Sequence, residues 1–171
     1  MLLSQFSSFG FAGRRSGAGV PVARALAASL PVGAAVFATC GRGVQAVGAA
    51  VPGAVVFRQS SPAFSGLAPR ARFAVRAAAF VAALAAAPSP VLLVWPGVPA
   101  PFGLLPQFGR KRWQSCGSGS WSEMAVAVGW GLPVVVFGHR PPAPARPVSV
   151  SGFPGWLVSP VQRPLVLIGA F

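Results

Sequence analysis

The sequence predicts an α/β fold in which helices cover both faces of a mainly parallel sheet. Short apolar runs rich in β-branched residues alternate with longer helical runs over residues 1–140. Glycine-containing turns follow several of these predicted strands. The chain has 171 residues, of which 54% are hydrophobic, and this is enough for one domain with its own core. We therefore predict one domain of about five strands over residues 1–140, with a Pro-rich C-terminal tail over residues 141–171.

The first half of the chain contains alternating strand and helix patterns. Residues 5–12 form an apolar run that predicts a strand. Residues 20–29 place Val22, Leu26 and Ser29 on one face at helical spacing, which predicts a helix. The same alternation continues with a predicted buried strand over residues 34–38, a helix over 44–50 and a strand over 54–57.

The second half begins with the strongest helix pattern of the chain, the alanine-rich residues 70–87. A strand over residues 91–95 and a long loop follow, and then a glycine turn leads into the apolar run 124–130 and a strand over 134–137. After Gly138 the prolines of the C-terminal tail predict an extended linker, and residues 165–168 predict either an added edge strand or a segment that packs back on the domain.

The formal charge of +13 arises from missing acids, because Glu123 is the only acidic residue beside 14 Lys and Arg. Non-specific binding of polyanions at low salt is expected from this imbalance. The two cysteines, Cys40 and Cys116, have no CxxC motif or His/Cys cluster around them. We therefore expect a reducing, cytoplasmic location and no metal site, and we assign no cofactor.

A membrane span is the alternative to weigh for residues 77–95, which carry no charge and are long enough to cross a bilayer. Pro88 and Pro90 interrupt this stretch, and a spanning helix needs continuity there. We therefore expect no contact with a membrane.

Three small-residue turns at the ends of predicted strands are the candidate binding elements. Small residues let backbone N–H groups and the positive end of a helix approach a phosphate. Because carboxyl ends of parallel strands meet at one edge of a sheet, we expect the turns to converge there. The turns are Gly13-Arg14-Arg15-Ser16, Cys40-Gly41-Arg42-Gly43 and Gly117-Ser118-Gly119-Ser120, and the residues predicted to contact the ligand are Gly13, Arg14, Gly41, Arg42, Gly43, Gly117, Ser118, Gly119 and Ser120. The last turn is expected to hold the phosphate of a nucleotide or nucleotide-derived ligand.

Two charged residues have both a structural and a chemical interpretation. Ser120 and Glu123 form the Ser-x-x-Glu pattern of a helix-capping box, which would explain both residues without any reaction. Arg76 falls on one side of the predicted helix, where it would either meet solvent or bind a phosphate. Trp121 would stack on a base or join the core.

The turns resemble those of the Rossmann-like superfamily that joins the DNA-processing protein Smf (DprA) to the LOG-type, lysine-decarboxylase-like phosphoribohydrolases. Residues 115–123 are similar to the LOG pattern Pro-Gly-Gly-x-Gly-Thr-x-x-Glu, with Ser-Cys in place of Pro-Gly. Residues 39–45 resemble the Smf turn small-x-x-Arg-Gly-hydrophobic-Asp, with Gln45 in place of the aspartate. The resemblance implies a Rossmann-like fold, with Arg76 binding a phosphoribosyl group and Glu123 acting at the glycosidic carbon.

The sequence leaves several functions open. A nucleotide-binding module is the leading hypothesis, and a phosphoribohydrolase that cleaves an N-glycosidic bond of a nucleoside monophosphate is the enzymatic alternative. Single-stranded DNA binding in the manner of Smf would use Arg14, Arg15, Arg42 and residues 110–112. The chain has no Asn, Asp or Tyr, a bias that also arises in a spurious reading frame without function. The ligand and the oligomeric state are not fixed by the sequence.

Overall fold

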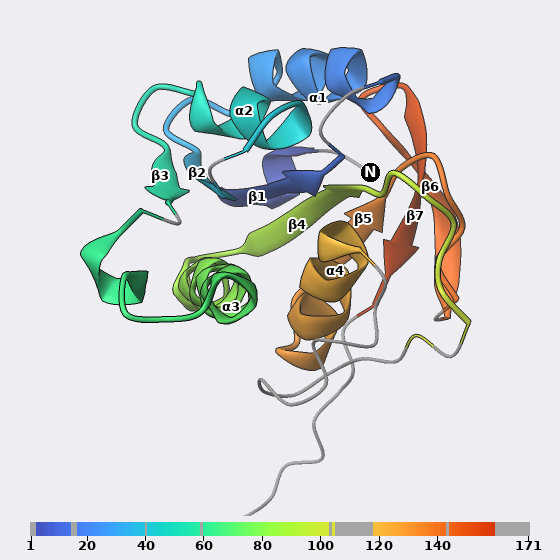
Figure 1. Ribbon diagram of the computed structural model, residues 1–171. Coiled ribbons are helices and arrows are strands. Elements are labelled where there is room, and N and C mark those ends of the chain that lie inside the picture. Colours follow the sequence, from blue (N-terminus) through green and yellow to red (C-terminus); the bar gives the residue numbers. More distant parts are fainter. Residues whose placement is uncertain are drawn as a thin grey trace, which may run out of the picture.

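The computed structural model describes residues 3–14, 17–39, 41–58, 60–102, 104, 118–142 and 144–159. It has a seven-stranded sheet with the strand order β3-β2-β1-β4-β5-β7-β6 (Figure 1). The strands are β1 (Ser8–Gly13), β2 (Ala35–Thr39), β3 (Val55–Phe57), β4 (Pro90–Trp95), β5 (Val134–Val136), β6 (Ala145–Val150) and β7 (Phe153–Val158). The first five strands pair in parallel, and the last two add antiparallel pairs. The predicted α/β class with a mainly parallel sheet is confirmed, but the predicted number of strands was wrong.

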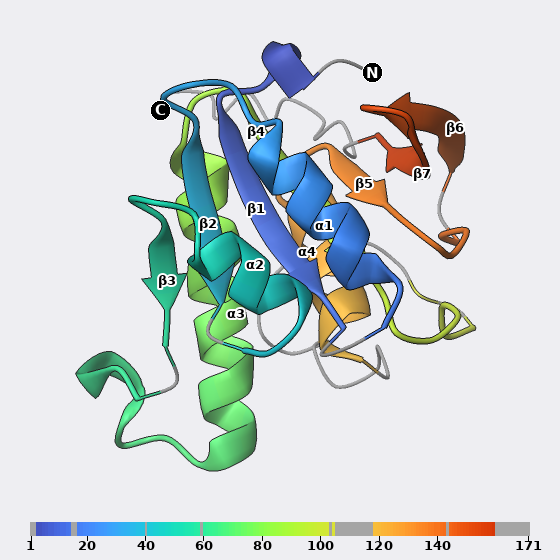
Figure 2. The ribbon, with the colours of Figure 1, turned by 90° about the horizontal axis from the view of Figure 1, so that it is seen from above.

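The helices occupy the positions that hydrophobic spacing predicted, with ends that differ by one residue or so in most cases. They are α1 (Gly19–Ala28), α2 (Val44–Ala49), α3 (Pro69–Ala86) and α4 (Gly119–Gly129), with short 3-10 helices η1 (Leu3–Gln5) and η2 (Pro62–Phe64). Figure 2 shows α1 and α2 on one face of the sheet and α3 and α4 on the other. Among the residues described, no helix combines the length and apolarity needed to cross a membrane.

The sheet divides the core into two halves, because alternate strand residues point to opposite faces. In β4, Leu92 and Val94 pack with α3 and α4, whereas Leu93 and Trp95 pack with α1 and α2. These side chains are almost completely buried. Burial of each leucine or valine of this kind stabilises the fold by about 2 kcal/mol relative to an exposed position. Both faces of the strand are therefore fixed by packing, as its continuous apolar sequence requires.

The two additional strands form a hairpin where an extended linker was predicted. β6 pairs with β7, and β7 continues the sheet by pairing with β5 at Val135 and Leu157. Ser151 and Gly152 make the two-residue turn, with φ angles of 49° and 86°. The sequence did not predict these strands because Pro147 and Pro154 interrupt the alternation of apolar and polar residues that marks a strand. Pro147 is tolerated because β6 is the edge strand, where a missing N–H breaks no ladder bond to a further strand. The edge strand predicted over residues 165–168 lies outside the described residues.

The order of strands reverses at β1. The chain runs from β1 outward through β2 to β3, and then crosses to β4 on the other side of β1. The intervening helix changes from the α1/α2 face to the α3/α4 face at the same point (Figures 1 and 2). In open α/β sheets such a reversal leaves a crevice outside the carboxyl ends of the two central strands, and ligands bind there.

Candidate functional site

A cavity of about 380 Å³ lies at this reversal, beyond the carboxyl ends of β1, β4 and β5. Its wall combines the start of α1 with the beginning of β7. The lining residues are Arg14, Ala18, Gly19, Val22, Trp95, Pro96, Phe137, Gly138, His139, Phe153 and Pro154. Apolar side chains dominate, while Arg14 and His139 provide polar groups, which is the usual composition of a small-molecule pocket.

Arg14 is held in the cavity wall by its backbone. Its N–H donates to the carbonyl of Trp95 at 2.8 Å, and its carbonyl accepts from the N–H of Val44 at 3.2 Å. Its guanidinium lies against Gly17, where a Cβ atom would be only 2.8 Å from Cζ. Gly17 also has a φ of +96°, which disfavours any other residue. Arg14 therefore lies against Gly17, two residues before the start of α1.

The second predicted turn contacts the first. Gly43, with a φ of 65°, precedes α2, and Val44 at the start of this helix donates the bond to Arg14. A Cβ atom on Gly13 would be 3.0 Å from Cβ of Val44, so the close approach requires glycine. At Gly41, an added Cβ would collide with the side chain of Gln45. The structure thus brings two of the three predicted turns together and leaves Arg42 exposed between Gly41 and Gly43.

An aromatic stack supports the floor of the cavity. The rings of Phe11 and Trp95 are 6.0 Å apart at 13°, and those of Trp95 and Phe137 are 4.5 Å apart at 11°. Trp95 is only 3% exposed, and its indole Nε1 donates to no described residue. Trp95 and His139 were not predicted as site residues. The available signal was their position near the carboxyl ends of apolar strand runs, since Trp95 ends β4 and His139 follows β5 by three residues.

The third predicted turn begins α4, but it is capped differently from the prediction. Ser118 is the N-cap, and its Oγ accepts a hydrogen bond from the N–H of Trp121 at 3.3 Å. The hydroxyl of Ser122 donates to the carbonyl of Ser118 at 2.9 Å. The capping box of Ser120 and Glu123 was therefore wrong, because the helix starts earlier and turns both side chains inward. Gly117 and Cys116 lie outside the described residues.

The start of α4 is packed against protein. A Cβ atom on Gly119 would lie 2.6 Å from Cζ of Phe73 in α3, so the small size of this residue is required by helix packing. Trp121 is fully buried and donates from its Nε1 to the carbonyl of Val98 at 2.9 Å. Of the two interpretations of Trp121, the core position is the one observed. A phosphate contact of this turn stays a prediction.

Arg76 and Glu123 are brought together between α3 and α4. Glu123 is fully buried and Arg76 is 3% exposed, and the Arg76 guanidinium lies 4.8 Å from the centre of the Phe73 ring. Burial raises the pKa of Glu123 from 4.5 to about 7, and the charge of Arg76 opposes this rise. No described residue donates a hydrogen bond to either carboxylate oxygen.

The position of this pair bears on its predicted catalytic role. A carboxyl group with a pKa near neutrality suits proton transfer. Glu123 lines neither of the two cavities described in this structure. Its catalytic role and that of Arg76 remain predictions.

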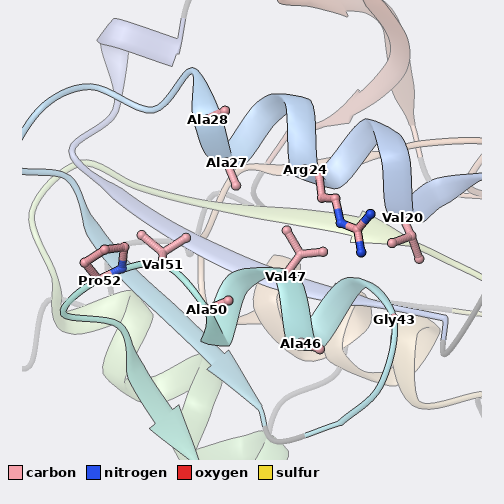
Figure 3. Close-up of a pocket in the computed structure, with 10 residues that line it drawn as sticks. All are labelled: Val20, Arg24, Ala27, Ala28, Gly43, Ala46, Val47, Ala50, Val51 and Pro52. Atoms are coloured by element: carbon pink, nitrogen blue, oxygen red, sulfur yellow. The ribbon is translucent and has the colours of Figure 1, made fainter.

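The second cavity is a groove of about 470 Å³ between α1 and α2 (Figure 3). Alanine and valine side chains from the two helices line most of it, including Ala27, Ala46 and Val47. Arg24 projects into it from α1 and is its one charged lining residue. The groove is therefore a surface of helix packing with one cation at its margin.

Comparisons with known proteins add no relative. The sequence matches no protein-family model, and searches of curated proteins and of solved structures find no match. Within the described residues, no group of three or more His, Cys, Asp or Glu side chains could hold a metal ion. The fold and the cavity at the strand ends are therefore the basis for a functional assignment.

Proposed function

We propose that this protein binds a nucleotide or nucleotide derivative in the cavity at the carboxyl ends of β1, β4 and β5. The observation that carries the proposal is the meeting of Arg14, the start of α1 and an apolar wall in one cavity at the strand reversal. This is where α/β sheets of this topology bind ligands. The phosphate is assigned to the turn between β1 and α1, since the described part of the turn before α4 packs against Phe73.

The start of α1 has the properties of an anion site. The first N–H groups of a helix have no partner within the helix and carry a partial positive charge. In the first turn of α1, Pro21 has no N–H and the N–H of Val20 donates to the carbonyl of Gly17 at 3.0 Å, which leaves the N–H of Gly19 to face a ligand. Among the described residues, no side chain caps α1 and its first turn contains no acid. Arg14 adds a full positive charge beside these groups, and guanidinium pairs well with phosphate. A phosphate at this turn would therefore meet both backbone and side-chain donors.

The remaining wall suits a sugar and a base. Val22, Phe137 and Phe153 give it an apolar surface, and His139 adds a polar group at its rim. A volume of about 380 Å³ is at the small end of the usual range for ligand pockets. The enclosed part of the ligand is therefore the size of a mononucleotide or one half of a dinucleotide. These features agree with the Rossmann-like fold and the Smf/LOG resemblance that we propose for the chain.

A phosphoribohydrolase is the second candidate, and the buried Arg76–Glu123 pair favours it. The raised pKa of Glu123 is the kind of perturbation found at catalytic carboxylates. Such an enzyme would release free base from a nucleoside monophosphate, with the two residues acting at the oxocarbenium-like centre. Chromatographic detection of free base, absent in Glu123→Gln, would establish it. If the nucleotide stays intact after prolonged incubation, the enzymatic candidate is wrong and the proposal of a nucleotide-binding module remains.

The binding proposal is tested by calorimetric titration with AMP, ADP, NAD⁺ and inorganic phosphate in about 0.3 M salt, where exposed charges are largely screened. We expect nucleotides to bind more tightly than phosphate, and Arg14→Gln to weaken binding about tenfold through loss of a charge-assisted contact. Arg146→Gln is the matched control, because Arg146 is exposed on β6 at the far edge of the sheet. Equal losses in both variants would indicate general charge attraction, including that of single-stranded DNA.

A further inference from the structure

The turn after β2 carries an exposed arginine where many dinucleotide sites carry a carboxylate. In sheets with this reversal, an Asp or Glu near the end of the second strand accepts a hydrogen bond from the ribose 2′-hydroxyl, whereas an arginine there accommodates a 2′-phosphate. Here β2 ends at Thr39, and the exposed Arg42 follows in the turn to α2. Glu123, the only acid of the chain, is fully buried between α3 and α4. A carboxylate is therefore not available to hold a free ribose hydroxyl at β2.

A backbone hydrogen bond joins the turn that carries Arg42 to Arg14, which lines the cavity. Val44, two residues after it, donates its N–H to the carbonyl of Arg14 at 3.2 Å. The Arg42 turn therefore lies beside the β1–α1 turn, on the β2 side, while the cavity extends from the same turn toward β4 and β5. Phosphates at the β1–α1 turn would therefore have the Arg42 turn on one side and the cavity on the other, with room for one nucleoside at each. That is how a dinucleotide spans the strand reversal.

The two sides of the β1–α1 turn differ in charge and in polarity. Beyond Arg14 at the turn itself, the wall on the cavity side is largely apolar, and its polar groups are His139 and the indole N–H of the buried Trp95, which donates to no described residue. On the β2 side Arg42 is exposed, and Arg24 projects from α1 into the neighbouring groove that Gly43 also lines (Figure 3). The more strongly charged end of the ligand thus belongs on the β2 side.

We propose that the site takes a dinucleotide whose adenosine ribose carries a 2′-phosphate, as in NADP⁺, and that Arg42 is its specificity residue. The inference rests on the nucleotide function proposed above. The planar guanidinium of Arg42 donates two parallel hydrogen bonds to the 2′-phosphate, which NAD⁺ lacks. Arg14 and the start of α1 hold the pyrophosphate, and the nicotinamide half enters the cavity beside Phe137 and His139.

The test is calorimetric titration of the full chain with NADP⁺ and NAD⁺ in about 0.3 M salt. We expect NADP⁺ to bind about tenfold or more tightly than NAD⁺, as expected for a hydrogen-bonded charge pair. Arg42→Gln should remove this preference, and Arg42→Lys should restore part of it. Arg42→Asp should favour NAD⁺, because its carboxylate repels the 2′-phosphate and accepts from the free 2′-hydroxyl. Arg146→Gln should leave the preference unchanged.

The outcomes separate this inference from the proposed function. Binding of AMP and NAD⁺ with no preference for NADP⁺ would overturn the 2′-phosphate assignment and leave nucleotide binding standing. A preference that survives in Arg42→Gln but not in Arg146→Gln would overturn the role of Arg42. Absence of binding to every nucleotide would overturn both proposals. Circular dichroism melts of all variants serve as the folding control, since both arginines are exposed.

Discussion

Two of the helices that follow small-residue turns, α1 and α4, begin in opposite environments. The start of α1 faces a cavity, beside the guanidinium of Arg14. The start of α4 is capped by Ser118 and closed by Phe73, which occupies the space that a side chain at Gly119 would need. Both turns contain glycine and serine, and both were predicted to bind the ligand. The difference shows that a glycine before a helix can make room for a ligand or for an aromatic ring of the same protein.

The neighbouring elements explain this difference. α4 lies beside α3 on the same face of the sheet, so the first residues of α4 meet side chains from α3. α1 begins at the strand reversal, where β2 and β4 lead to helices on opposite faces. No described helix therefore closes the α1 turn in the way that α3 closes the α4 turn. The comparison predicts that changes near α4 act on stability and changes near α1 act on binding.

The largest expected effect on the closed side is a pH dependence from Glu123. The unfolded chain releases this proton near pH 4.5, but the folded chain holds it to about pH 7. The contribution of Glu123 to stability is therefore highest below pH 4.5 and falls as the pH rises to about 7, by roughly 3 kcal/mol. Urea denaturation of the wild type and Glu123→Gln across this range measures it. The variant should lose this pH dependence. If the free energy of unfolding changes with pH in the same way in both proteins, the pKa of Glu123 is not raised by burial.

A smaller loss of stability is expected for Gly119→Val. The new side chain would collide with Phe73, and overpacking of this kind costs about 2 kcal/mol. Phe73→Ala in the same chain should recover part of this loss. Gly66→Val is the matched control, because a Cβ atom there meets nothing within 4 Å. Nucleotide affinity should stay unchanged. A stable Gly119→Val protein that no longer binds nucleotide would contradict this account and would assign the phosphate to the turn before α4.

The smallest effect is expected for Ser118→Ala, which removes the cap of α4. Loss of such a cap costs about 1 kcal/mol. Thermal denaturation should show a lower melting temperature, with nucleotide affinity equal to that of the wild type. Ser120→Ala should cost less, because Ser118 and not Ser120 accepts the cap bond from the N–H of Trp121. A larger loss for Ser120→Ala would restore the original capping assignment.

The sequence predicted the strands and helices up to β5 because each has a continuous apolar run or a clear helical spacing. It did not predict the β6–β7 hairpin, since Pro147 and Pro154 interrupt the alternation that marks a strand. The cap of α4 was misplaced because serines at 118, 120 and 122 all precede the apolar run that begins at Met124. The extended backbone of Ser118 and the bond that its Oγ accepts from the N–H of Trp121 distinguish it from the other two.

The candidate site was predicted in part. Arg14 follows from the turn that ends the first strand, and its convergence with the Arg42 turn follows from the parallel sheet. Trp95 and His139 were missed because the cavity combines single residues from several elements, and none of them belongs to a local motif. The Smf/LOG resemblance implied catalytic roles for Arg76 and Glu123, but it did not predict that the two residues lie together. Their complete burial depends on tertiary packing between α3 and α4.

The most direct test of the central claim compares the backbone amides of the two helix starts by NMR. Titration of ¹⁵N-labelled protein with ADP should shift the amide signals of Gly17, Ala18 and Gly19, and leave those of Gly119 and Trp121 unchanged. Inorganic phosphate at equal ionic strength is the control for charge alone. Shifts confined to the start of α4 would contradict the account and place the phosphate at the turn before that helix.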